Sequence, residues 1–461
     1  MHVTKHRKKT FSLLNKSEVD VGYLLRRAGF GAQPGQVQTA AAQGLGVAAN
    51  QLVDYEQTPD NFTPPPDAIL MARKYDPSDL TVWWLNLMVT TTRPLEEKMT
   101  LYWHGHFATA IQKVGDTRFM YRQNQLFRDI ALGRFDDLLM AVYKDPAMMI
   151  WLDGERNIKA APNENYGREV MELFTLGIGN YTEDDVHAAA RAFTGWRLDR
   201  QTGNVTFIPR LHDSSQKTFL GQTGNWDGDD ASRILAAHPA TGRFLATKLW
   251  KFFASDQPPQ SAIQKLSDVY YSSDHMIREM VRTLFTIPEF YAAPTRTGHI
   301  KSPVEFVVGS ITQLGLANVD LRVATRTLTL LGQQLFNPPN VGGWPAGSSW
   351  INAATMLGRF NFASYLTGDN ATRAKGPVDV AAMLAATDAG PGDAINSATR
   401  SQIIGSLTGY VSDTLGISLT SATRKALLGY MRDAPVDTNG LEAKLRGMVH
   451  LALVSPEYQA S

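Results

Sequence analysis

Residues 153–196 read DGERNIKAAPNENYGREVMELFTLGIGNYTEDDVHAAARAFTGW, and this stretch decides what kind of fold the chain has. Asn163 follows a proline and opens a helix that ends at Gly177. Thr182 caps a second helix, and Asp185, three residues further on, is the reciprocal acid of a capping box. Two capped helices in direct succession predict a helical fold.

The first of these helices has an apolar arc with one carboxylate at its border. At about 100° per residue, the arc consists of Val170, Met171, Leu173, Phe174 and Leu176. Glu164, Arg168 and Glu172 lie on the opposite side as a solvated row of charges. Glu169 borders the arc, and isolated burial of its charge would cost several kcal/mol. We therefore expect Glu169 to be largely buried, either in an ion pair with a distant arginine or lysine or as part of a functional site.

Composition excludes several classes of protein. The chain has 461 residues, a formal net charge of +1 and 19% charged residues, so it lacks the basic footprint of a nucleic-acid-binding protein. It contains no cysteine, which excludes disulfides, thiolate metal sites and cysteine nucleophiles. No stretch is long and apolar enough to span a bilayer. The basic start MHVTKHRKKTFSLLNKSEVD has no apolar h-region, so no signal peptide is visible and a cytoplasmic location is the default expectation.

We expect an all-α fold with one small antiparallel β-hairpin near residues 204–221, where apolar and polar residues alternate around a polar turn. Helix caps and apolar stripes with a 3.6-residue period cover most of the remaining chain. The predicted segments are an N-terminal helical part at 1–57, a helical core at 68–366, a linker-like stretch at 367–398, and C-terminal helices at 399–461 that pack on the core.

Two histidines, His104 and His106, stand one residue apart in the motif YWHGHF. On a regular helix, residues at i and i+2 point about 200° apart, whereas in an extended segment they share a face. Gly105 between them permits a break in the helix that would let both rings face one metal ion. The alternative is that each imidazole hydrogen-bonds to the backbone beside the surrounding aromatic residues.

The loop at 337–350, NPPNVGGWPAGSSW, contains three prolines and three glycines, which exclude regular structure. Its two tryptophans indicate that the loop is nevertheless packed against the core. Long loops of this kind often carry function, and a packed structural Ω-loop is the alternative interpretation.

Several motifs together resemble the bacterial family called domain of unknown function 1800. They are WHGHFAT at 103–109, PNENYGREVMELFTLGIGNYTEDDV at 162–186, ARAFTGW at 190–196, HDSSQKTFLG at 212–221, KSPVEF at 301–306 and PPNVGGWP at 338–345. The resemblance runs from about Leu24 to Phe362 and implies a mostly helical protein with a single fold, without implying an activity. Many relatives look exported and are encoded beside proteins of the sulfatase-like domain of unknown function 1501 family, which the resemblance implies as a partner. This sequence departs from that pattern because it shows no signal peptide.

The family motifs are also rich in side chains that bind metals. We expect His104, His106, His212 and Glu169, with Glu172 as a further candidate, to converge on one first-row transition metal: iron, copper, manganese or zinc. A type-3 dicopper centre needs six histidines, and the motifs hold too few. The sequence shows no nucleotide cofactor motif.

The first functional hypothesis is therefore a metal-dependent enzyme of unknown substrate, with oxidative chemistry and with Glu169, Glu172 and Arg168 as candidate catalytic residues. Zinc-type hydrolysis is an alternative, because two histidines and a glutamate with one open position also suit a hydrolase. A different class of alternative is a non-catalytic helical binding or assembly protein, in which the polar motif residues form a structural network. Hydrolysis by a Ser-His-Asp triad finds no G-x-S-x-G sequence.

Overall fold

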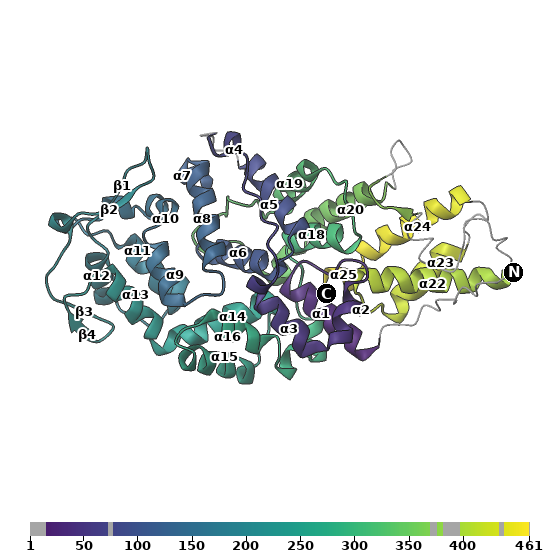
Figure 1. Ribbon diagram of the computed structural model, residues 1–461, viewed down its shortest axis with the longest axis horizontal. Helices are drawn as coiled ribbons and strands as arrows, with labels where there is room; N and C mark the ends of the chain where they lie inside the picture. The colour runs from purple at the N-terminus through teal and green to yellow at the C-terminus, as the bar shows by residue number, and fades with distance from the viewer. Residues whose placement is uncertain (1–14, 72–76, 369–375, 381–396, 433–437, 461) are drawn as a thin grey trace. The chain divides into compact units, whose positions relative to one another are not determined.

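The computed structural model describes residues 15–71, 77–368, 376–380, 397–432 and 438–460. Helices form nearly all of its regular structure, and the β-structure of these residues is two short antiparallel hairpins (Figure 1). The prediction of a mostly helical fold is confirmed. No helix among the described residues is both long enough and apolar enough to cross a membrane.

The chain divides into two compact units. Unit 1 comprises Met1–Ala48, Arg296–Gly332 and Ala346–Ser461, and unit 2 comprises Ala49–Thr295 and Gln333–Pro345. The predicted N-terminal and C-terminal helical segments thus contribute to the same unit. Most of the predicted linker-like stretch at 367–398 lies outside the described residues.

Unit 2 contains the motif helices and both hairpins. Its elements are η1 (Tyr55–Gln57), α4 (Asp67–Met71), α5 (Ser78–Thr90), α6 (Pro94–His106), α7 (Ile111–Val114), α8 (Thr117–Asp129), α9 (Phe135–Val142), α10 (Pro146–Trp151), η2 (Gly154–Arg156), α11 (Glu164–Glu169), the π-helical η3 (Val170–Thr175), α12 (Glu183–Ala192), β1 (Trp196–Leu198), β2 (Val205–Phe207), η4 (Pro209–Leu211), β3 (Lys217–Phe219), β4 (Gln222–Gly224), α13 (Gly228–Ala237), α14 (Pro239–Phe253), α15 (Gln260–Ser272), α16 (Ile277–Leu284) and η5 (Pro288–Tyr291).

Helix α6 lies in the core of unit 2. It starts at Pro94, where the missing N–H costs nothing, and every residue from Leu95 to His104 is buried. A helix that is buried on all sides has to satisfy its polar side chains internally. The Trp103 indole N–H accordingly donates to the carbonyl oxygen of Ala131, at 2.8 Å.

The helix that opens the motif stretch changes its winding midway. Asn163 caps α11 as predicted, but from Val170 the helix continues as the π-helix η3, in which the Leu176 N–H donates to the Met171 carbonyl oxygen. Gly177, with φ of +80°, then ends the helix. The reciprocal capping box predicted at Thr182 is present at the start of α12.

The β-structure differs from the single hairpin expected at 204–221. Strand β2 pairs with the preceding strand β1, with Trp196 opposite Phe207. Strand β3 pairs with the following strand β4, with Phe219 opposite Gln222. The residues between β2 and β3 form η4 and an irregular turn. The alternating pattern was therefore a correct sign of strands, but each strand found its partner outside the predicted range.

Unit 1 is helical throughout its described part. Its elements are α1 (Lys16–Ala28), α2 (Gln36–Gln43), α18 (Pro303–Gln313), α19 (Leu321–Leu330), η6 (Gly347–Trp350), α20 (Ala353–Thr367), α22 (Ser397–Leu415), α23 (Ser421–Arg432), α24 (Thr438–Leu453) and α25 (Pro456–Gln459). The unit borders fall within α3 (Leu45–Val53) and α17 (Ala293–Arg296). Helix α25 lies beside the start of α18, where the Lys301 N–H donates to the Gln459 carbonyl oxygen at 2.9 Å.

Candidate functional site

The two motif histidines lie at the end of α6, which continues through Gly105 without a break. The expectation that the backbone departs from a helix here is wrong. The loop at 333–345 packs closely against the helix at Gly105. A Cβ at Gly343 would lie 2.3 Å from the Gly105 carbonyl oxygen. Gly343 also has φ of +82°, so the close approach and the backbone conformation both call for glycine.

His104 is buried among aromatic rings and holds that loop. Its Nε2 accepts the backbone N–H of Phe336 at 3.0 Å, and its ring lies 5.3 Å from each of the Trp84 and Trp344 rings. Burial lowers the pKa of His104 to about 3, so the imidazole is neutral. Since Nε2 is the acceptor, the proton is on Nδ1 and the lone pair of Nε2 is already used.

His106 is buried in a separate aromatic environment. Its Nε2 lies 3.0 Å from the carbonyl oxygen of Phe174, which requires a proton on Nε2. Burial, and after it the charge of Lys248, lowers its pKa well below the usual value. Its Nδ1 is buried with no hydrogen-bond partner among the described residues. The two histidines therefore interact with different segments, the loop at Phe336 and the π-helix at Phe174.

His212 follows η4 in the turn between the hairpins. Its Nδ1 lies 3.0 Å from the Thr194 carbonyl oxygen, to which it donates. The adjacent Asp213 accepts from the Arg191 guanidinium at 2.7 Å, which ties the turn to α12. The polar residues of this motif thus fix an irregular segment to the helix before it.

Glu169 does not form the ion pair that its position predicts. It is half-buried, and none of the described residues gives it a hydrogen bond or ion pair. Burial raises its pKa, and the charge of Glu172 raises it further. Glu172 itself accepts a hydrogen bond from the Tyr181 hydroxyl, and Arg168 pairs with Glu183 at 2.8 Å.

The predicted metal ligands are thus distributed over several local networks. Among the described residues, no group of three or more His, Cys, Asp or Glu side chains could hold a metal ion. The convergence of His104, His106, His212 and Glu169 on one metal stays a prediction, and metal binding would require these side chains to rearrange.

The structure adds a feature that the sequence analysis missed, a basic cavity of about 650 Å³ where the motif stretch meets α14. Three cations line it, Arg243, Lys248 and Lys251, and none of its described lining residues is acidic. Lys248 donates to the Leu173 carbonyl oxygen at 3.2 Å, and its pKa is lowered to about 8 by burial and then by Lys251. The sequence signal for this cavity was the set of basic residues Arg243, Lys248 and Lys251 on the otherwise apolar and aromatic helix α14.

The fold and these networks define a helical protein in which most of the family motifs lie in unit 2, while KSPVEF at 301–306 lies in unit 1. Residues 23–460 match the family described as "Protein of unknown function (DUF1800)", and the chain belongs to that family. The resemblance drawn from the motifs is thereby confirmed over nearly the whole chain. Comparisons with curated proteins and with solved structures gave no match.

Proposed function

We propose that this chain is a non-catalytic helical binding protein, in which the family motifs form the frame that presents the basic cavity to an acidic partner. The observation that carries this proposal is the hydrogen bond from the Phe336 N–H to His104 Nε2. A nitrogen lone pair that accepts a buried backbone N–H is unavailable as a metal ligand or a general base. His106 and His212 each donate to a backbone carbonyl oxygen, so the fold engages one nitrogen of each ring.

The basic cavity is the part of this frame that suits a partner. Arg243 and Lys251 carry charges that are not balanced by an acid in the cavity lining, so carboxylate groups would bind there with charge-assisted hydrogen bonds. Arg243 is positioned by amide oxygens of Gln260 and Gln264, neutral acceptors that leave its charge uncompensated. The family resemblance points to a protein of the domain of unknown function 1501 family as the partner, which would contribute an acidic segment.

Co-expression of the chain with a protein of the domain of unknown function 1501 family, followed by co-purification, tests this proposal. Charge reversal by Arg243→Glu together with Lys251→Glu is expected to abolish co-purification. Arg233→Glu is the matched control, because Arg233 is an exposed arginine in the same unit that lines no described cavity. Equal binding by both variants, or no complex with the unaltered chain, would overturn the proposal.

A metal-dependent enzyme is the second candidate function. It is favoured by His212, whose Nδ1 is engaged while no described residue hydrogen-bonds to its Nε2, an arrangement that orients metal-binding histidines. Elemental analysis of protein purified without a histidine tag separates the two candidates. Iron, copper, manganese or zinc in stoichiometric amount, lost in His212→Ala, would support the enzyme and contradict a purely binding function.

A further inference from the structure

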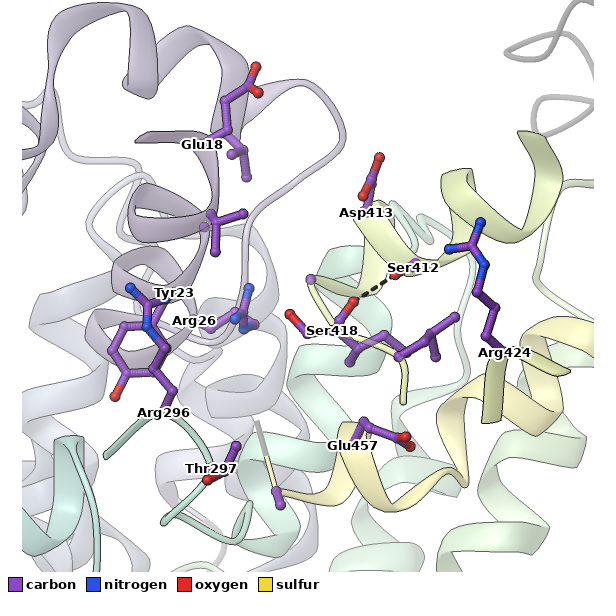
Figure 2. Close-up of a pocket in the computed structure, with 17 residues that line it drawn as sticks. Glu18, Tyr23, Arg26, Arg296, Thr297, Ser412, Asp413, Ser418, Arg424 and Glu457 are labelled. Atoms are coloured by element: carbon purple, nitrogen blue, oxygen red, sulfur yellow. Dashed lines mark hydrogen bonds between the residues drawn. The ribbon is translucent and has the colours of Figure 1, made fainter. Parts of the chain in front are cut away.

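Unit 1 contains its own cavity, of about 330 Å³, which is distinct from the basic cavity of unit 2. Figure 2 shows its walls: α1 on one side, the turn between α22 and α23 on the other, and α25 with the residues after α17 below. Both ends of the sequence thus contribute to one site. Its lining contains charges of both signs together with apolar side chains.

Arg26 of α1 is an unpaired cation in this cavity. None of the described residues forms a hydrogen bond or ion pair with its side chain, and its Nε is completely buried without a partner. The guanidinium lies against the turn at Gly416, where a Cβ would come within 2.1 Å of Nη1. Arg26 is half-buried, so its Nε loses hydration without gaining a partner, a cost that a bound anion would offset.

The surroundings of Arg26 increase this need for an anion. Burial, and after it the positive charge of Arg27, lowers the pKa of Arg26 to about 10. Arg27 donates to the Arg296 carbonyl oxygen, and Arg296 forms an ion pair with Asp20. Asp20 thus pairs with Arg296, and this ion pair does not include Arg26.

Asp413, near the end of α22, provides the opposite unpaired charge. It is half-buried, and no described residue gives it a hydrogen bond or ion pair. Burial, and after it the charge of Glu18, raises its pKa to about 6. No described ion pair joins Asp413 to Arg26, and neither charge shifts the pKa of the other group.

A third acid limits what can enter. Glu457 accepts hydrogen bonds from the Thr420 N–H at 3.0 Å and the Thr423 hydroxyl at 2.7 Å, and despite its burial these donors lower its pKa to about 2. Its fixed negative charge disfavours a multiply charged anion such as phosphate. A singly charged carboxylate that carries its own cation is favoured instead.

We propose that this cavity binds a small zwitterion, an amino carboxylic acid, whose carboxylate pairs with Arg26 and whose ammonium group lies between Asp413 and Glu18. Each charged end of such a ligand meets an unpaired opposite charge, and charge-assisted bonds of this type are the strong ones. A volume of about 330 Å³ lies at the lower end of ligand cavities and has room for one amino acid. The apolar side chains of Val19, Val37 and Ile417 would contact its carbon chain.

Titration calorimetry on the full chain tests the proposal with probes that separate its two halves. Glycine, β-alanine and γ-aminobutyrate place the carboxylate and ammonium at increasing separation, whereas acetate, ethylammonium and inorganic phosphate each supply charge of one sign only. We expect at least one of the three zwitterions to bind about tenfold more tightly than each of these three control probes. No binding of any zwitterion, or equal binding of acetate or phosphate, would overturn the proposal.

Three variants connect the binding to the named side chains. Arg26→Gln and Asp413→Asn should each weaken binding of the best zwitterion by about tenfold or more. Arg432→Gln, an exposed arginine of the same unit that does not line the cavity, should leave it unchanged. Circular dichroism and a thermal melt verify that each variant is folded, and unaltered binding by folded Arg26→Gln or Asp413→Asn would overturn the assignment.

Discussion

Arg128, a buried arginine of unit 2, and Arg26, a half-buried arginine of unit 1, have opposite environments. Arg128 donates from Nε and Nη2 to the two carboxylate oxygens of Glu97, at 2.7 and 2.8 Å, and from Nη1 to Asn124. Glu97 also accepts the Trp84 indole N–H. Arg26 has no such partner among the described residues. The charge of Arg26 therefore forms no described interaction that stabilises the fold, and this favours a ligand that pairs with it.

The pKa values of Arg128 and Arg26 are shifted in opposite directions by these environments. Burial lowers the pKa of Arg128, but the charge and hydrogen bonds of Glu97 outweigh this and raise it overall. For Arg26, burial and neighbouring cations together lower the pKa. A paired buried charge serves the fold, whereas an unpaired one is a cost that a bound ligand can offset.

The largest effect is expected from breaking the paired arginine. Glu97→Gln leaves Arg128 buried with a neutral partner and should lower the free energy of unfolding by about 3–5 kcal/mol, measured by urea unfolding followed by circular dichroism. The control is Glu56→Gln, because Glu56 forms an exposed ion pair with Arg278 and should contribute less than about 1 kcal/mol. Similar losses in both variants would contradict the distinction between buried and exposed pairs.

Asp145 is an intermediate case, a buried acid held by neutral donors. Its Oδ2 accepts from Gln123 Nε2 and the Met148 N–H, while Oδ1 is buried without a described partner. Burial raises its pKa to about 7, although these donors oppose the shift. The folded pKa exceeds the unfolded one, so the native state binds the proton more strongly and stability falls as pH rises from about 4 to about 7.

Asp145→Asn should remove this pH dependence. Relative to the unaltered protein, the variant gains stability toward pH 8 and loses it toward pH 4, by on the order of 2–4 kcal/mol across the window. Denaturant unfolding at several pH values measures the difference. A constant difference between the two proteins at all pH values would show that Asp145 does not titrate in this range.

Substitutions of His104 distinguish a structural role of this residue from a metal-binding role. His104→Leu leaves the Phe336 N–H buried without an acceptor, which should cost about 1–3 kcal/mol. His104→Gln retains an acceptor and should recover part of this loss. Unfolding measurements and metal content are compared in the two variants, and a loss of bound metal with unaltered stability would contradict the structural role.

Local signals explain which parts of the fold could be predicted. The caps at Asn163 and Thr182 depend on residues within one helical turn, and both are present. The π-helix from Val170 and the unbroken helix at Gly105 depend on packing against other segments, which helical periodicity does not describe. The second hairpin was missed for the same reason, since pairing is set by neighbours outside the window considered.

The candidate sites were predictable only in part. The helical wheel predicted that Glu169 is largely buried and paired, whereas it is half-buried and no described residue pairs with it. Residue type also could not indicate which backbone group each histidine would bind. The cavity at Arg26 needs α1 to meet the turn after α22, a contact between residues almost four hundred positions apart. No local pattern around Arg26 could show that its partner would be absent.

The smallest expected change in stability is also the one that best sharpens the comparison between the two arginines. Arg26→Gln removes a half-buried charge that no described residue compensates. Without ligand, the free energy of unfolding of the variant should therefore equal that of the unaltered protein or exceed it by up to about 1 kcal/mol. Arg128→Gln, by contrast, leaves the buried Glu97 unpaired and should be strongly destabilising. The two variants make the same chemical change, so unfolding curves recorded side by side isolate the effect of the partner. If Arg26→Gln were as destabilising as Arg128→Gln, Arg26 would have a structural partner in solution, and its unpaired charge would no longer argue for a ligand.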